Sequence, residues 1–169
     1  MNNDHIAHKI AHRAFWSDIN CRPELRAQVE NIMADNSCDC EPDFLGFLGQ
    51  YYHLSKIIPY DRVIYDLGCC YGIQSWFFRK HEKYIGVDIH EGLQFQLPNT
   101  VYHQSQIKDF LIKHVIKKPH FAICNYVPPW GDNNKELTKK YFEDVFVFYP
   151  QGINPLRLFK KATKHQKSS

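Results

Sequence analysis

VIYDLGCCYG at residues 63–72, followed by YIGVD at residues 84–88, decides the fold that this sequence predicts. The first segment is an apolar run that ends in a glycine-containing turn, and the second is a strand-like run that ends on Asp88. A strand, a glycine turn, a helix and a second strand ending on an acid form half of a nucleotide-binding α/β unit, in which the acid binds ribose hydroxyls. Asp88 follows Gly68 by 20 residues (88 − 68), the separation that this geometry requires.

The glycine spacing then distinguishes between ligands. A nicotinamide site usually reads Gly-x-Gly-x-x-Gly, because the pyrophosphate lies against a helix N-terminus. Here Asp66 precedes Gly68 by two residues, and the middle glycine is missing. A carboxylate at the strand tip would repel a pyrophosphate but suits a ligand that carries an ammonium group. The spacing therefore disfavours a dehydrogenase.

The same segment resembles the first motif of class I S-adenosylmethionine-dependent methyltransferases, Asp/Glu-x-Gly-x-Gly-x-Gly. The resemblance implies S-adenosylmethionine as the cofactor, with Asp66, Gly68 and Gly72 lining its methionine end and Asp88 holding its ribose. Cys70 stands where the family has its second glycine, so it would line the pocket and narrow it or weaken binding.

Ser105 and Gln106 follow the third predicted strand, at the place where members of this family contact adenine. Gln106 could bond the amino edge of the base. The alternative is that Gln106 is simply the first residue of a helix.

After residue 60, apolar segments alternate with helix-like segments. This alternation predicts an α/β fold, Rossmann-like and doubly wound, with a mostly parallel sheet of about five strands and helices on both faces. The expected strands are Arg62–Asp66, Tyr84–Asp88, Thr100–His103, Phe121–Asn125 and Val145–Tyr149, and the expected helices are Ile73–Lys80, Gln106–Ile116 and Glu136–Phe142.

The first sixty residues show helical spacing of apolar side chains, which predicts an N-terminal helical cap. These helices are expected either to cover a sheet edge or to form a lid over the cofactor. Only 20 residues follow Tyr149 (169 − 149), so the two closing strands usual in the family do not fit, and a shortened C-terminal end is expected.

The fourth predicted strand runs into Asn125-Tyr-Val-Pro128-Pro129-Trp130. This is similar to the Asp/Asn/Ser-Pro-Pro-Tyr/Phe/Trp motif of methyltransferases that modify an amino nitrogen. The resemblance implies that Pro128 and Trp130 contact the acceptor. Val127 stands at the polar position, so Asn125 could hold the amino group only if the chain bulges. The alternative is a strand-terminating loop with Trp130 packed in the core.

Composition favours one compact domain. The chain has 169 residues, 44% apolar and 15% aromatic, which is enough to bury a core. We expect a helical extension at residues 1–60, a cofactor-binding core at 61–150 and a basic tail at 151–169. No apolar run approaches the roughly 18 residues of a membrane span, and the N-terminus lacks a signal-peptide pattern, so a cytoplasmic protein is expected.

The six cysteines fit no disulfide framework and are expected to be reduced thiols. Cys38 and Cys40, together with Cys21, raise a zinc hypothesis, but the spacing is unusual and no fourth ligand is evident. No metal site is therefore predicted.

Charge is unevenly distributed along the chain. Residues 151–169 carry five basic residues and no acid, so the remainder has a net charge of −2 (3 − 5). The tail could contact nucleic acid, or it could be a solvated chain end.

The leading hypothesis is methyl transfer from S-adenosylmethionine to an amino nitrogen of an unidentified acceptor: a nucleic-acid base, a small molecule or a protein side chain. The alternative is a non-catalytic binding protein built on a decayed methyltransferase fold, which Cys70 and Val127 favour.

Overall fold

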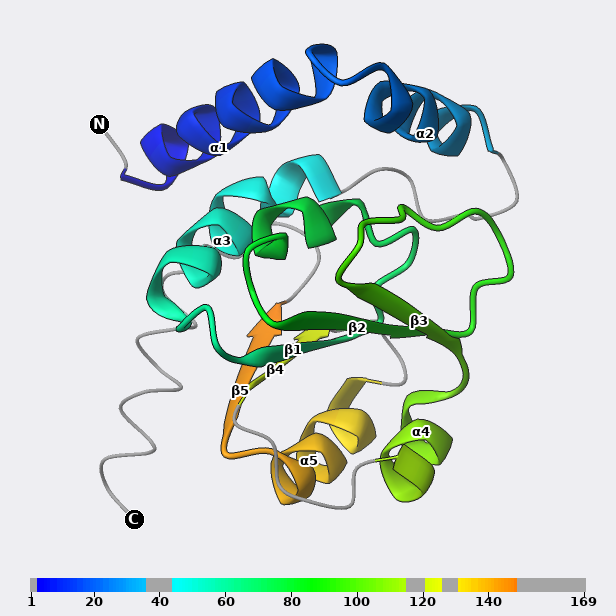
Figure 1. Ribbon diagram of the computed structural model, residues 1–169. Coiled ribbons are helices and arrows are strands. Elements are labelled where there is room, and N and C mark those ends of the chain that lie inside the picture. The colour runs from blue at the N-terminus through cyan, green and yellow to red at the C-terminus, as the bar shows by residue number, and fades with distance from the viewer. Residues whose placement is uncertain (1–2, 36–43, 115–120, 126–130, 149–169) are drawn as a thin grey trace.

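Five parallel strands form a single sheet in the order β3-β2-β1-β4-β5 (Figure 1). The computed structural model describes residues 3–35, 44–114, 121–125 and 131–148. This architecture confirms the predicted Rossmann-like α/β fold. The strands are β1 (Val63–Leu67), β2 (Lys83–Asp88), β3 (Thr100–Gln104), β4 (Phe121–Asn125) and β5 (Asp144–Phe148).

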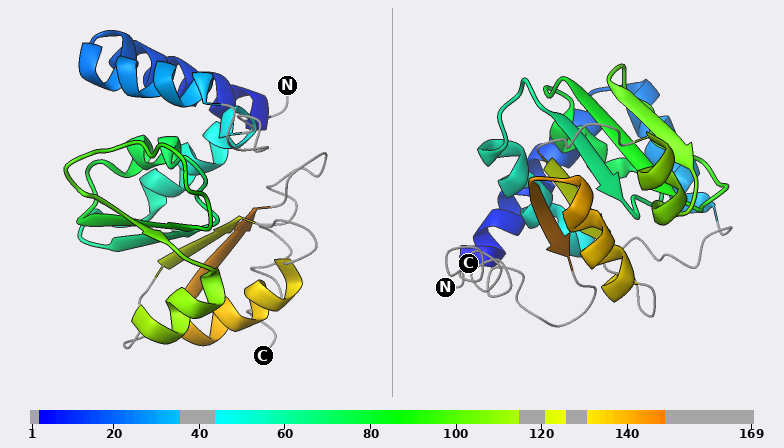
Figure 2. Two further views of the ribbon diagram at one scale, coloured as in Figure 1. Left: turned by 90° about the vertical axis from the view of Figure 1, so that its right-hand side faces the viewer. Right: turned by 90° about the horizontal axis from the view of Figure 1, so that it is seen from below.

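Helices cover both faces of the sheet, as the alternating sequence pattern predicts (Figures 1 and 2). One face carries α1, α2, α3 and the short helix η1, and the other carries α4 and α5. Their bounds are α1 (Asn3–Asn20), α2 (Pro23–Ala34), α3 (Phe44–Ile57), η1 (Ile73–Phe78), α4 (Ile107–His114) and α5 (Gly131–Tyr141). Within the described residues, no helix is both long and apolar enough to cross a membrane.

Two hydrophobic cores result, because successive side chains of a strand point to opposite faces of the sheet. The core beneath α4 and α5 consists of Leu67, Val87, Phe110, Leu111, Ala122 and Phe142. The larger core lies on the other face and draws many of its members from the N-terminal helices, among them Phe15, Val29, Leu48, Tyr51 and Leu54. The N-terminal helices are therefore packed into the main core.

The segment after the glycine turn differs from the prediction. Residues 73–80 were expected to form an α-helix, but η1 is a 3₁₀-helix that spans Ile73–Phe78. All six of its residues are buried, so the segment has no solvent face. Their aromatic rings pack against α1 and α3, where Phe15 meets Trp76 edge-on at 5.4 Å between ring centroids. This packing against two helices accounts for a short, tight element in place of an amphipathic helix.

The five strands and α4 start within one residue of their predicted bounds, whereas α5 begins five residues earlier than expected, at Gly131. The chain runs from β1 outward to β3 and then returns to the other side of β1 to form β4. Sheets of this kind bind ligands at the carboxyl ends of the strands, where the strand order reverses. Here that crevice lies at the ends of β1 and β4.

Candidate functional site

The turn after β1 is built from residues with left-handed backbone conformations. Gly68, Cys70 and Gly72 have φ angles of 83°, 48° and 70°. The Gly68 amide donates a hydrogen bond to the Val87 carbonyl at 2.8 Å, which ties the turn to the end of β2. Glycine adopts positive φ without steric cost, whereas Cys70 adopts it although its Cβ atom makes this conformation unfavourable.

Asp88 joins this turn from the last position of β2. Its Oδ2 accepts a hydrogen bond from the Cys70 amide at 2.7 Å, and its Oδ1 accepts one from the His90 amide at 3.0 Å. The side chain is partly exposed. Each carboxylate oxygen has about two acceptor positions, so both oxygens can accept a further hydrogen bond. Two acceptor positions of this kind can receive hydrogen bonds from the two hydroxyls of a ribose.

Ser105 and Gln106 lie on the other side of Asp88. Gln104 pairs with Asp88 in the β2–β3 ladder, and the Ser105 amide donates to the Asp88 carbonyl at 2.9 Å. Gln106 is exposed, and its carbonyl accepts the Phe110 amide at the start of α4. The structure thus brings the turn, Asp88, Ser105 and Gln106 together at one edge of the sheet.

Asp66 is placed differently from these residues. It was expected to face a ligand ammonium group, but its side chain is fully buried beneath the turn. Gln74 Nε2 donates to Asp66 Oδ2 at 2.9 Å and to the Cys69 carbonyl at 2.8 Å, and the Tyr84 hydroxyl also donates to Asp66. Burial, followed by the charge of Asp66, raises the pKa of Tyr84 well above its ordinary value, so Tyr84 remains a donor. In this structure Asp66 fixes the turn from below.

Cys69 is a protonated thiol in this environment. Burial raises its pKa well above the ordinary value, and the nearby charges of Asp66 and Asp88 raise it further. Because the thiolate is the nucleophilic form, Cys69 is unsuited to nucleophilic catalysis.

Tyr102 of β3 fills the space beside two glycines. A Cβ atom on Gly72 would lie 2.4 Å from the Tyr102 hydroxyl oxygen, and one on Gly86 would lie 2.5 Å from its Cδ1. The hydroxyl donates to the Phe95 carbonyl at 2.5 Å, and burial raises the pKa of Tyr102. Gly72 therefore makes room for Tyr102. Tyr102 is not among the residues predicted from the sequence, although a glycine inside a strand, here Gly86, signals a close approach of this kind.

A shallow cavity of about 550 Å³ opens near Asp88, between the end of α2 and the loop after β2. The Tyr71 hydroxyl donates to the Asp35 carbonyl at 3.2 Å, and the Tyr71 ring meets His90 edge-on at 4.6 Å between centroids. These contacts connect the turn to the cavity wall. The lining residues are Asn31, Ala34, Asp35, Glu91, Gly92 and Leu93.

Asn125 ends β4 at the same edge of the sheet. Cys124 pairs with Leu67, so the backbone of Asn125 lies one position further on, level with the start of the turn. Pro128 and Trp130 lie outside the described residues, as do Cys38, Cys40 and the basic tail. The acceptor-binding roles of Asn125, Pro128 and Trp130 stay predictions. Within the described residues, no three His, Cys, Asp or Glu side chains are grouped to hold a metal ion.

No known family profile and no curated protein matches the sequence. Solved structures resemble the fold. A plantazolicin methyltransferase in complex with a substrate analogue and SAH is 18% identical, with 87% of this chain and 59% of that one covered and a TM-score of 0.49. An SAH complex of a Streptococcus mutans protein assigned as a methyltransferase is 16% identical, with 68% and 77% covered and a TM-score of 0.48. The aTrm5 complex with tRNALeu is 15% identical, with 68% and 37% covered and a TM-score of 0.48.

Proposed function

We propose that this protein is an S-adenosylmethionine-dependent methyltransferase that acts on an amino nitrogen. The observation that carries the proposal is the contact between the glycine turn and the partly exposed Asp88, at the edge where the strand order reverses. The glycine turn lacks the middle glycine that is usual in a nicotinamide site, which favours this cofactor over a dinucleotide.

In this proposal, different described residues contact different parts of the cofactor. Asp88 accepts hydrogen bonds from the ribose hydroxyls, while Ser105 and Gln106 lie on the adenine side. Gly68 and Cys70 line the methionine end, above the buried Asp66. When bound, S-adenosylmethionine supplies a methyl group that is activated by its sulfonium sulfur.

The acceptor side belongs to Asn125, Pro128 and Trp130. An amino nitrogen needs no strong base, because hydrogen bonds to carbonyl and amide oxygens suffice to orient its lone pair. Holding the nitrogen in line with the methyl group then supplies most of the rate. His90 lies beside Asp88, to which its backbone amide donates a hydrogen bond, but this chemistry does not require its ring as a base. A nucleic-acid base, a small molecule and a protein side chain all remain acceptor classes within the proposal.

Calorimetric titration with S-adenosylmethionine, SAH and NAD tests the cofactor. We expect both S-adenosyl compounds to bind and NAD not to bind. Asp88→Ala removes a charged acceptor and should cost about 1.5–3 kcal/mol, roughly ten- to a hundredfold in affinity. Asp61→Ala, which changes an exposed carboxylate before β1, serves as the matched control and should bind normally. Unchanged affinity in Asp88→Ala, or tight NAD binding, would refute the assignment.

Trp130→Ala tests the acceptor side. If Trp130 stacks on a flat acceptor, the variant should lose methyl transfer while its cofactor affinity and melting temperature stay close to those of the parent. If Trp130 is instead a core residue, the same variant should lose about 3–5 kcal/mol of stability.

A non-catalytic binding protein is the second candidate, favoured by Cys70 in a position with positive φ where the family has glycine. It would bind the cofactor, yet show no transfer to a pool of nucleic acids, small amines and peptides.

A further inference from the structure

A second cleft, of about 180 Å³, lies at the opposite edge of the sheet from Asp88. Tyr60 precedes the amino end of β1, and Arg79 and Lys80 precede the amino end of β2. The cleft is lined by Ala14, Tyr52, Ser55, Lys56, Tyr60, Trp76, Phe77, Arg79 and Lys80. It is therefore separate from the candidate cofactor site.

The cleft is strongly basic. Lys56, Arg79 and Lys80 line it, and no lining residue is acidic. Within the described residues, neither lysine takes part in an ion pair. Burial has the largest effect on the pKa of the Arg79 guanidinium and lowers it, the charge of Asp18 raises it, and the charge of Arg22 lowers it again, so both an acid and a fourth cation lie near Arg79.

Asp18 lies beside the cleft and forms an ion pair with Arg22. Asp18 Oδ1 accepts from Arg22 Nε at 3.0 Å, and its Oδ2 accepts from Trp76 Nε1 at 2.7 Å. The carboxylate thus has partners on both oxygens, and one of them, Trp76, belongs to the lining of the cleft. Two exposed acids lie close to Tyr60: Asp61 follows it in the sequence, and the Glu82 amide donates to its carbonyl at 2.7 Å. None of these three acids lines the cleft, whose lining carries three positive charges.

Two of the cations are held on aromatic rings. The Arg79 guanidinium lies 3.8 Å from the Trp76 ring centroid, and its Nη1 donates to the Trp76 carbonyl at 2.9 Å. The Lys56 ammonium lies 5.1 Å from the Tyr52 ring centroid. These contacts already restrict the two long side chains, so they lose less conformational entropy when they bind a ligand.

Tyr60 supplies a flat surface beside these charges. Its side chain is 50% exposed, although its ring packs edge-on against His81 at 5.1 Å between centroids. A half-exposed aromatic ring next to fixed cations is the combination with which proteins bind single-stranded nucleic acids, through stacked bases and neutralised phosphates.

We propose that this cleft binds single-stranded nucleic acid, with a backbone phosphate between Lys56, Arg79 and Lys80 and a base stacked on Tyr60. A volume of about 180 Å³ is below the usual range for a whole small-molecule ligand, and suits one phosphate and its sugar. An acidic peptide would use the cations but has no need of the exposed ring. The proposal goes beyond methyl transfer, because the cleft is at the far edge of the sheet.

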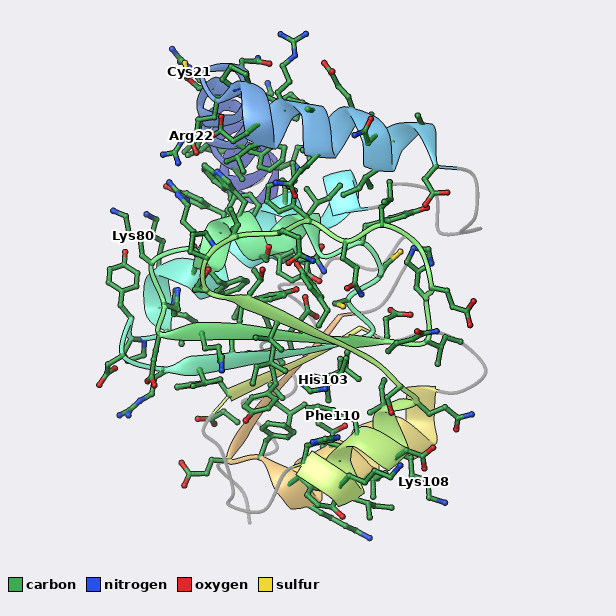
Figure 3. The ribbon with its side chains drawn as sticks, turned by 45° about the vertical axis from the view of Figure 1, so that its right-hand side comes forward. Cys21, Arg22, Lys80, His103, Lys108 and Phe110 are labelled. Carbon is green, nitrogen blue, oxygen red and sulfur yellow. The ribbon has the colours of Figure 1, made fainter. Side chains whose placement is uncertain are left out.

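Fluorescence anisotropy with a labelled twelve-residue oligothymidylate, without added cofactor, tests the proposal. The double variant Lys56→Gln/Lys80→Gln removes two exposed charges of the cleft. The control Lys108→Gln/Lys113→Gln removes two exposed charges of α4, on the other face of the sheet, where Figure 3 shows Lys108 far from Lys80 and Arg22. Both pairs change the net charge equally, and both should unfold at the parent temperature.

We expect the cleft pair to weaken binding on the order of tenfold at about 0.1 M salt, and to reduce the salt slope by about 1.4. The control pair should change affinity by less than about twofold. Tyr60→Leu should weaken binding at least about fivefold without changing the salt slope, whereas Tyr60→Phe should bind normally.

Three outcomes would overturn the proposal. The parent protein could fail to bind the oligonucleotide at 0.1 M salt. The two lysine pairs could weaken binding equally, which would indicate diffuse attraction by net charge. Polyglutamate of equal charge could displace the oligonucleotide as well as unlabelled oligothymidylate does, with Tyr60→Leu unaffected, which would assign the cleft to acidic peptides. None of these readouts depends on S-adenosylmethionine.

Discussion

At the scale of single residues, Cys70 combines a costly conformation with a useful contact. An L-residue at φ 48° pays a steric penalty of roughly 1–2 kcal/mol that glycine does not. The contact that holds the turn to Asp88 uses the backbone amide of Cys70, which any residue except proline provides. The thiol is therefore dispensable for anchoring the turn.

Cys70→Gly should accordingly keep or improve cofactor binding. Its unfolding free energy should stay within about 1 kcal/mol of the parent, because the relief of the steric penalty is offset by the larger conformational entropy that glycine gives the unfolded chain. Cys70→Val should be less stable, because a β-branched residue tolerates positive φ poorly. Urea unfolding and titration with S-adenosylmethionine check both variants. Unfolded Cys70→Gly protein would mean that the thiol is needed for core packing.

The sequence alone could identify the residues of the site that belong to a spaced motif. The turn and Asp88 were found because a nucleotide-binding unit fixes their separation, and the structure brings them into direct contact. Gln74 and Tyr102 were missed, because their roles depend on tertiary contacts with Asp66 and Gly72 that no local spacing encodes. The burial of Asp66 was missed for the same reason.

At the scale of elements, the pairing of β2 with β3 depends on the close fit between the Tyr102 ring and Gly86. A Cβ atom on Gly86 would lie 2.5 Å from Tyr102 Cδ1 and 2.8 Å from the Cys69 sulfur. Tyr102 is anchored through its hydroxyl to the Phe95 carbonyl, and Cys69 is buried, so neither neighbour moves aside easily. The loop at Phe95 and the glycine turn are thus held through one tyrosine.

Gly86→Ala should lower the unfolding free energy by about 1–3 kcal/mol, through overpacking against the ring. A double-mutant cycle measured by urea unfolding checks the cause. In a Tyr102→Val background, where no ring fills the space, the cost of Gly86→Ala should fall by at least about 0.5 kcal/mol. An unchanged cost in that background would assign the strain to Cys69 or to the backbone.

Elements were predictable where burial alternates along the sequence, and unpredictable where it does not. The strands have apolar runs with buried and half-buried positions, and they were placed within one residue. In η1 every side chain is buried, including the polar residues Gln74 and Ser75. From the sequence alone, these two residues have the pattern of the exposed positions of a surface helix. The periodicity of apolar residues alone does not distinguish one type of fully buried secondary structure from another.

At the scale of the whole molecule, the N-terminal helices are part of the core. Phe15 of α1 is fully buried and contacts both Trp76 and Phe77 of η1, the element that follows the glycine turn. Helices that merely covered a sheet edge would contribute little to stability. These contacts instead connect α1 to the segment that supports the candidate site.

Phe15→Ala should therefore cost about 3–5 kcal/mol of unfolding free energy. Ile10→Ala, at a position of the same helix that is 47% exposed, is the matched control and should stay within about 0.5 kcal/mol of the parent. Chemical unfolding followed by tryptophan fluorescence measures both. Similar small losses for the two variants would show that α1 is a dispensable extension.

The strand order also sets the sequence in which the molecule can assemble. β1, β2 and β3 are neighbours along the chain, whereas β4 pairs with β1 through Ile64 and Phe121, 57 residues apart (121 − 64). Closing that long loop costs entropy before its contacts form, so β4 and β5 should dock after the other three strands. Pulse-labelled hydrogen exchange would detect later protection in β4 than in β2. Because the crevice needs both β1 and β4, the capacity to bind ligand would be the last property that the folding chain acquires.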